Sequence, residues 1–182
     1  IRKLMKHLSK KDVDHFREHF RPHMPKEIVE DYKEWISNFD IEAVLNQYHD
    51  DVDNFYFYGA IPRDFRKCSV SNLCNIDIEK HMDRGEHKIG IVFNTDESDD
   101  DGKHWLSMFI DILGSNLDGQ PGIYHFDSFG SKPIKEVKKL INKLQKQGSK
   151  KDIEFVVSNN DRSFQNNSYS CGFYCMHFME HM

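Results

Sequence analysis

The sequence has no apolar run near the ~20 residues that a membrane-spanning helix needs, and we expect neither a membrane span nor a secretory leader. It also lacks a basic excess, because its net charge of -5 is the reverse of what a general nucleic-acid-binding protein carries. Internal repeats and low-complexity linkers are missing too. Its 182 residues are 38% hydrophobic and 13% aromatic, which predicts one packed globular domain.

Cysteine is scarce, with Cys68, Cys74, Cys171 and Cys175 as the four examples. A domain of this size needs no disulfide to fold, so we expect free thiols in a reducing compartment. The chain shows no second close pair of Cys or His with zinc-site spacing, and we expect no metal. Cys68 and Cys74 are interpreted as ordinary free thiols and Cys175 as a core residue.

The apolar pattern predicts helices first and a sheet afterwards. Ser9 is expected to cap a first helix that Pro22 and Pro25 interrupt, and Asp40 is expected to cap a helix over residues 41–48. Strands are predicted over residues 55–61, 88–93, 104–112, 122–127 and 153–157. Further helices are predicted over residues 133–147, ended by Gly148, and over residues 171–182. This order of elements favours an α+β fold.

Cys171 stands between a polar, turn-prone loop and an apolar helix, in Ser170-Cys171-Gly172. We therefore expect its sulfur at a helix N-terminus, where free backbone N–H groups and the helix dipole stabilise a thiolate. Gly172 is expected to let a substrate backbone come close. The alternative is a buried structural cysteine, the commoner role of this residue type.

A nucleophilic thiol needs a base, and His104 is the candidate among eleven histidines because it opens a strand after an acidic loop. Asp127 ends another strand, where its carboxylate is expected to accept from the Nδ1–H of that imidazole. Gln165 lies six residues before Cys171. Its side-chain amide and the Cys171 backbone N–H would form an oxyanion hole.

These residues resemble one family, the ubiquitin-like-protein (SUMO) proteases and their viral relatives, among them the adenovirus maturation protease. The resemblance rests on His104-Trp105, Asp127-Ser128 and the pair Gln165 and Cys171-Gly172, in that order along the chain. Two further stretches are similar: Trp35-Ile36-Ser37-Asn38, and the pair 93–96 and 102–105. Segments 93–96 and 102–105 are most like those of the polyprotein-processing cysteine proteases of large DNA viruses.

The resemblance implies a papain-like α+β fold of the adenain and SUMO-protease type, with a central mixed sheet flanked by helices. It implies cleavage after Gly-Gly-X or Gly-X-Gly motifs by a catalytic set of His104, Asp127 and Cys171, with Gln165 at the oxyanion. Two tryptophans wall the substrate tunnel in this family, and Trp35 and Trp105 fall at the matching positions. Asn38 is expected to contact substrate beside Trp35, although it replaces an acid of the family pattern. The alternative for both tryptophans is a core position.

The resemblance covers residues 35–182, so we expect a catalytic domain there and an N-terminal helical extension over residues 1–34. It implies a viral maturation protease that processes capsid or core precursors and needs no cofactor. A monomer is expected, and a peptide or DNA activator is left open as an alternative to an enzyme that needs none. The expected location is the viral factory in the host cytoplasm and the virion.

Three other functions stay open. A deconjugating enzyme that removes SUMO or ubiquitin-like modifiers would use the same residues on another substrate. An acyltransferase of this scaffold usually carries Glu as third member, where this chain has Asp127. A non-catalytic binding module would have no need of the four residues.

Three surface patterns have plainer interpretations. His15, His19 and His23 share a helical face, but Pro22 interrupts it and no further ligand completes a zinc site. The acidic run 96–102 looks like a calcium loop but lacks the closing Glu, and it would disfavour acidic substrates. The lysines of helix 133–147 are expected to face solvent, with nucleic-acid contact as the alternative.

Overall fold

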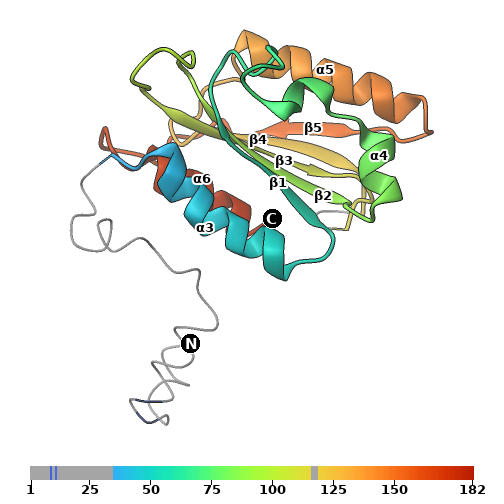
Figure 1. Cartoon of the computed structure of the whole chain (residues 1–182), viewed down its shortest axis with the longest axis horizontal. Coiled ribbons are helices and arrows are strands. Elements are labelled where there is room, and N and C mark those ends of the chain that lie inside the picture. Colours follow the sequence, from blue (N-terminus) through green and yellow to red (C-terminus); the bar gives the residue numbers. More distant parts are fainter. Residues whose placement is uncertain (1–8, 10, 12–34, 116–118) are drawn as a thin grey trace.

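The computed structural model describes residues 9, 11, 35–115 and 119–182 (Figure 1). The predicted helices of the first third, with Val13, Phe16 and Phe20 and then Ile28, lie outside the described residues. The predicted role of residues 1–34 as a separate extension therefore stays a prediction.

A five-stranded sheet forms the centre of the molecule, with its strands in the order in which they occur along the chain. They are β1 (Phe55–Ile61), β2 (Lys88–Asn94), β3 (Trp105–Asp111), β4 (Gly122–Phe126) and β5 (Val156–Asn159). The two outer pairs, β1 with β2 and β4 with β5, are parallel, whereas the inner pairs are antiparallel. The predicted mixed sheet is thereby confirmed.

Helices cover both faces of this sheet (Figure 1). One face carries α3 (Asn38–Asp51) and α6 (Cys171–Glu180), which lie side by side. The other face carries α5 (Lys135–Ser149), with the short helices η2 (Asn72–Asn75) and α4 (Ile78–Asp83) beside it. The α+β architecture flanked by helices on both sides matches the expectation from sequence.

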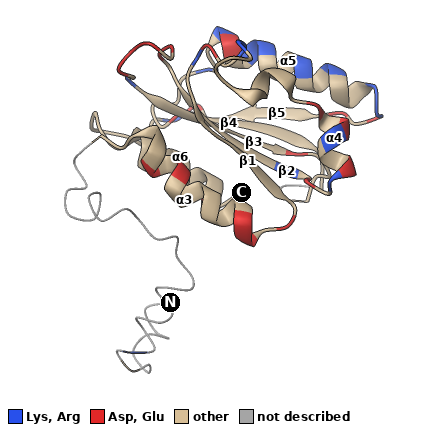
Figure 2. Cartoon of the chain, in the orientation of Figure 1, with Lys and Arg blue, Asp and Glu red and all other residues tan. Residues whose placement is uncertain are grey.

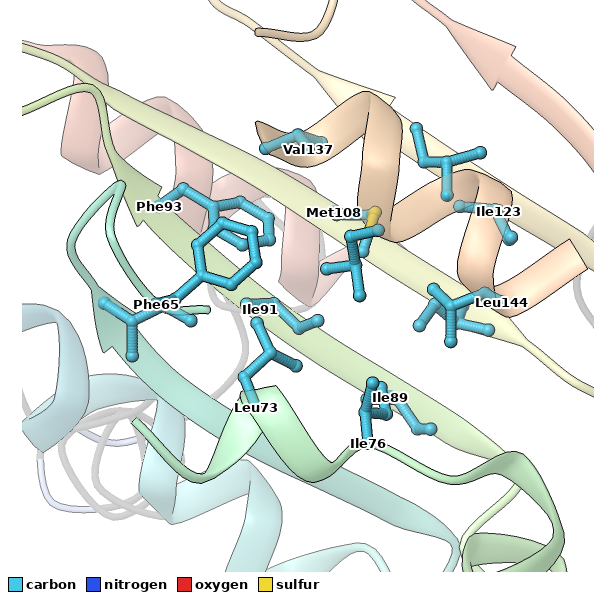
Figure 3. Close-up of a cluster of buried hydrophobic side chains, with 14 of the residues drawn as sticks. Phe65, Leu73, Ile76, Ile89, Ile91, Phe93, Met108, Ile123, Val137 and Leu144 are labelled. Carbon is cyan, nitrogen blue, oxygen red and sulfur yellow. The ribbon is translucent and has the colours of Figure 1, made fainter. Parts of the chain in front are cut away.

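Alternate residues of the central strands serve the two faces, because successive side chains of a strand point to opposite sides. On β3, Met108 and Ile110 are fully buried beneath α5, as Figure 3 shows for Met108 together with Ile91 and Leu144. Phe109 points the other way, into the cluster formed with α3 and α6. The sheet is therefore packed between two apolar layers, which hold the ends of its strands in place.

The start of α3 differs from the prediction by one turn. Ser37, not Asp40, is the N-cap: its side chain accepts from the Asp40 N–H, and the Asp40 carboxylate accepts from the Ser37 N–H at 2.8 Å. Asp40 occupies the third helical position of a capping box, which needs an acid there as much as a Ser at the cap. The predicted Asp40 cap was wrong for this reason.

The end of α5 also differs, since Gly148 lies inside the helix rather than after it. A Cβ at Gly148 would come within 2.7 Å of the Ile153 carbonyl oxygen, so the glycine is required by close packing instead of by termination. A turn follows the helix, and β5 therefore begins at Val156 instead of residue 153.

Cys68 and Cys74 form a disulfide, which contradicts the expectation of two free thiols. The turns between β1 and η2 bring the two Cα atoms to 5.3 Å, within the range that a disulfide spans. Cys171 and Cys175 are the free cysteines of the described residues, and both are buried as expected for Cys175. The spacing of the two cysteines in the sequence did not indicate that the chain turns back here and brings them together.

Charge is distributed unevenly over the described surface (Figure 2). Lysines line α5, while acidic residues gather on the loop between β2 and β3. None of the helices in the described part of the chain combines the length and apolar character that crossing a membrane would require.

Candidate active site

Cys171 is the first residue of α6 and is 3% exposed. The first backbone N–H groups of a helix have no partner inside the helix, so they face the space in front of its N-terminus. They and the helix dipole favour a negative sulfur at this position. The predicted location of Cys171 at a helix start is confirmed.

His104 directly precedes β3 and lies between Asp127 and Cys171. Its Nε2 donates to Asp127 Oδ1 at 2.7 Å, and its ring also hydrogen-bonds the Cys171 side chain. The expected contact through Nδ1 was wrong, because the ring presents Nε2 to Asp127. Residues 104, 127 and 171, far apart in sequence, thus form one continuous hydrogen-bonded chain.

Burial and hydrogen bonding have opposite effects on the pKa values of His104 and Asp127. Burial disfavours the charged His104 ring, but its hydrogen bonds with Asp127 and Cys171 outweigh this effect and raise its pKa to about 9. Burial also opposes the Asp127 carboxylate, yet hydrogen bonds from His104 and its backbone neighbours lower its pKa to about 2. At neutral pH the arrangement therefore favours a protonated ring beside an ionised carboxylate.

Asp127 is fixed from several sides. Its carboxylate accepts from the backbone N–H groups of Phe129 at 2.9 Å and Ser131 at 3.2 Å, besides the bond from His104. Asn160 follows β5 and holds the Asp127 backbone, accepting from its N–H at 2.9 Å and donating to its carbonyl at 2.6 Å. The parallel pairing of β4 with β5 brings Asn160 to this place.

The ring of Phe129 lies against His104, with the two ring centroids 5.0 Å apart. Phe129 is 44% exposed, so one of its faces covers the imidazole while the other faces solvent. His125 lies two residues before Asp127 but is no alternative base. Its side chain is buried, and burial lowers its pKa to about 4, which keeps it neutral.

Gln165 is 4% exposed, and both ends of its side-chain amide are hydrogen-bonded. Ser128 Oγ donates to Gln165 Oε1 at 2.6 Å, while Gln165 Nε2 donates to the Asn167 carbonyl at 2.7 Å. A carbonyl accepts only, so this pair of contacts defines which end is the NH₂ group. One N–H of that group remains for a further acceptor.

The loop between Gln165 and Cys171 is held by Asn167. Its Oδ1 accepts from the backbone N–H groups of Tyr169 at 3.1 Å and Ser170 at 3.0 Å, which forms a turn just before α6. The same residue therefore holds the Gln165 amide through its carbonyl and shapes the approach to Cys171 through its side chain. Both parts of the expected oxyanion hole depend on this loop.

A groove of about 400 Å³ runs beside the residues that flank His104. Trp35, Asn38 and Trp105 all line it, so the structure brings together three of the residues predicted to contact substrate. Trp35 is 55% exposed, whereas Trp105 is 9% exposed and donates from Nε1 to the Ile36 carbonyl at 3.1 Å. Residues of the acidic loop also line the groove: Glu97, Ser98, Asp100, Asp101, Gly102 and Lys103.

Gly172 has a packing reason that the sequence did not show. A Cβ at this position would lie 2.4 Å from Ile36 Cδ1 and 3.3 Å from Trp105 Cδ1. Ile36 therefore occupies the space that the missing side chain leaves, and this contact joins the segment before α3 to the start of α6. The predicted approach of a substrate backbone to Gly172 stays a prediction.

Sequence reasoning gave Ser128 no role beyond its place in a pattern, and it missed Asn160 and Phe129 altogether. Asn160 stands in a polar loop among several similar residues, and nothing in its neighbours marks it. Only the pairing of β4 with β5 could have indicated it. For Ser128 a signal was present, because a Ser directly after a buried strand-end acid needs a partner for its hydroxyl.

Comparison with known proteins places these residues in a family. Residues 87–182 match the C-terminal catalytic domain of the Ulp1 protease family, and this segment holds residues 104, 127, 165 and 171. The chain is also 35% identical over 150 residues to the R355 protein of Acanthamoeba polyphaga mimivirus, which carries the name of a thiol protease. That match covers 82% of this chain and 48% of the mimivirus protein, so the chain spans about half the length of this relative.

Solved structures show the same fold at low sequence identity. The ASFV pS273R protease superposes with a TM-score of 0.66 at 22% identity, over 80% of this chain and 56% of that one. The SUMO protease Ulp1 superposes with a TM-score of 0.55 at 17% identity, over 94% and 82% of the two chains. The expected papain-like fold of the SUMO-protease type is confirmed by these matches. The chain belongs to the Ulp1 protease family, a family of cysteine peptidases.

Proposed function

We propose that the protein is an endopeptidase that cleaves viral structural precursors after small-residue motifs of the Gly-Gly-X or Gly-X-Gly kind. The observation that carries the catalytic part is the hydrogen-bonded chain from Asp127 through His104 to Cys171. The groove beside it, walled by Trp35 and Trp105, supports a preference for residues without side chains. The viral substrate is supported by the similarity to R355 and to the ASFV protease.

In the proposed mechanism His104 has already taken the proton of the Cys171 thiol before substrate is attacked, and the resulting thiolate, paired with the imidazolium, attacks the carbonyl carbon of the scissile peptide bond. A C–S bond forms while the carbonyl π electrons move to the oxygen. This oxyanion accepts from the free N–H of Gln165 and from the Cys171 backbone N–H. Asp127 stabilises the imidazolium throughout.

Collapse of the intermediate breaks the C–N bond, and His104 returns its proton to the leaving amine. Water then attacks the thioester as His104 accepts a proton from it. The C–S bond breaks, the acid leaves, and the thiol is restored. All proton transfers in the proposed cycle use side chains of this chain, and no step requires a cofactor.

The test compares Cys171→Ala with Cys175→Ala on a panel of Gly-Gly-X peptides, with circular dichroism as a check on folding. We expect Cys171→Ala to abolish cleavage and Cys175→Ala to retain it, because Cys175 lies fully buried one turn into α6. Cleavage by the Cys171→Ala protein would refute the proposed nucleophile.

The same panel separates the two substrate classes. Intact ubiquitin-like conjugates are included because a Ulp1 catalytic domain has been solved in complex with Smt3, a SUMO ortholog, and superposes with a TM-score of 0.50. Cleavage of peptides and a capsid precursor but not of conjugates supports the maturation role. The opposite result would make the enzyme a deconjugating isopeptidase.

The proposed role places the enzyme in the viral factory of the host cytoplasm and in the virion, acting as a monomer. An activating peptide or DNA is part of the proposal, since the lysines of α5 offer a basic face. Activity measured with and without duplex DNA, together with sedimentation of the protein, tests these two points.

A further inference from the structure

We propose that His177, Glu180 and His181, at the end of α6, form a binding site for one zinc ion. Each offers a ligand atom, and these atoms lie within 4.8 Å of one another, as no other group of three or more His, Cys, Asp or Glu does among the described residues. The spacing explains the cluster: residues three and four apart share one face of a helix. Two histidines at i and i+4 on a helix form a common zinc-binding pair.

The side chains of this site are held by contacts that leave a ligand atom available. His181 Nδ1 donates to the His177 carbonyl at 2.8 Å, which fixes the tautomer and leaves the Nε2 lone pair for a metal. The two imidazole rings lie with their centroids 4.1 Å apart. Glu180 accepts a hydrogen bond from the Tyr48 hydroxyl of α3, which orients its carboxylate from outside the helix.

The electrostatic setting also favours a cation. The last turn of a helix carries the negative end of its dipole, and all three residues lie in or directly after the last turn of α6. Two imidazoles and one carboxylate suit zinc, which completes four-coordination with water, whereas calcium and magnesium require oxygen ligands. Ligand atoms around a tetrahedral zinc lie about 3.4 Å apart, so rotamer changes of exposed side chains suffice to close the site.

The site is separate from the proposed catalytic centre, because Cys171 and the three residues lie at opposite ends of α6. A bound ion would cross-link three side chains at the end of α6. Through the contact of Glu180 with Tyr48, it would also connect this end of α6 to α3. It would therefore stabilise the layer that supports Cys171 without touching substrate. No role in hydrolysis follows, since the three side chains are exposed on the surface.

The test titrates zinc chloride into the whole 182-residue chain carrying Cys171→Ala, so that the free thiol does not compete. Isothermal titration should show one tight equivalent, and adding His177→Ala with His181→Ala should weaken this binding at least 100-fold. The matched control adds His15→Ala with His19→Ala instead and should leave the affinity unchanged. Tyr48→Phe should weaken binding about ten-fold through loss of the outer contact.

Two results would overturn the proposal: equal zinc affinity after loss of His177 and His181, or loss of affinity in the His15 and His19 control. If the double variant does not fold, the unsubstituted chain provides the answer by NMR. Paramagnetic cobalt should then broaden the ring signals of His177 and His181 first. Broadening confined to His104 would refute the site equally well.

Discussion

Ser128 Oγ lies 2.6 Å from Gln165 Oε1 and is fully buried there, one residue after the acid that holds His104. The hydroxyl thereby sets the rotation of the Gln165 amide and the direction of its remaining N–H. A single Asp-Ser pair at the end of β4 thus orients both the base and the proposed oxyanion donor. Changes at Ser128 should therefore affect the transition state more than substrate binding.

Ser128→Ala is expected to lower kcat about ten-fold with little change in KM, because the freed amide no longer points its N–H at the oxyanion. Gln165→Ala should cost about 100-fold or more. The double variant should cost no more than Gln165→Ala alone, since Ser128 acts through that amide. Steady-state kinetics on one Gly-Gly-X peptide measures all three.

The control for this series is Ser107→Ala, because Ser107 is an equally buried serine on β3 and belongs to the opposite face of the strand from Met108. It should leave kcat within about two-fold. Additive losses in the Ser128 and Gln165 double variant would show that Ser128 serves the fold instead of the amide.

Folding stability should fall as pH rises from neutral to 9. The pKa of His104 is raised from 6.5 to about 9, so in this interval the folded protein holds a proton that the unfolded chain has lost. The stabilisation is complete below pH 6.5 and is lost as pH rises through about 9. At about 1.4 kcal/mol per pH unit it amounts to at most about 3 kcal/mol.

Urea unfolding at pH 6.5 and pH 9 measures this difference, with His104→Gln as the reference that keeps every other titrating group. The reference protein should lose less stability over the interval than the unsubstituted protein. Identical losses would mean that the hydrogen bonds of His104 do not retain its proton in solution.

Removal of the Cys68–Cys74 disulfide by Cys68→Ser with Cys74→Ser should lower the free energy of unfolding by about 2 kcal/mol. The loop that it closes is short, so the loss of chain entropy in the unfolded state is modest. Thermal unfolding in the absence of reductant measures it. Dithiothreitol should lower the Tm of the unsubstituted protein but not that of the variant; an equal effect on both would contradict the prediction.

The acidic wall of the groove should disfavour acidic substrates. Asp100 and Asp101 line it, while Arg63 pairs with Glu97 at 3.2 Å and leaves that acid partly neutralised. Peptides with Lys upstream of the small-residue motif should have kcat/KM values about three-fold above those with Glu, an effect typical of exposed charges. The difference should shrink at high salt.

Asp100→Lys with Asp101→Lys should reverse this preference. Asp99→Lys is the matched control, because Asp99 belongs to the same loop but not to the groove lining. A preference that persists in the double variant would place the discrimination elsewhere.

The strands and the ends that carry His104 and Asp127 were predictable, because runs of β-formers flanked by polar loops have one interpretation in a domain of this size. Cys171 was predictable for a similar reason, as a polar loop meets an apolar helix there. The Asp40 cap was mispredicted because a capping box contains two suitable residues, and only the backbone shows which one precedes the helix.

Features that depend on how the folded backbone brings residues together could not be predicted from the sequence. The disulfide requires a fold-back between residues 68 and 74, and Asn160 requires knowledge of which strand pairs with β4. Which ring nitrogen of His104 faces Asp127 depends on how the folded chain orients the ring, and the sequence does not show this. Gly148 was assigned to helix termination, whereas close packing against residue 153 requires it; the packing of Ile36 against Gly172 was likewise not visible in the sequence.

The contact of Ile36 with Gly172 has a practical consequence for any shortened form of the enzyme. Trimming from the N-terminus as far as α3 would delete Ile36, expose the first turn of α6 to water and leave the Trp105 indole without its acceptor. The smallest stable fragment must therefore retain Ile36, well upstream of residue 87, where the match to the family's catalytic domain begins.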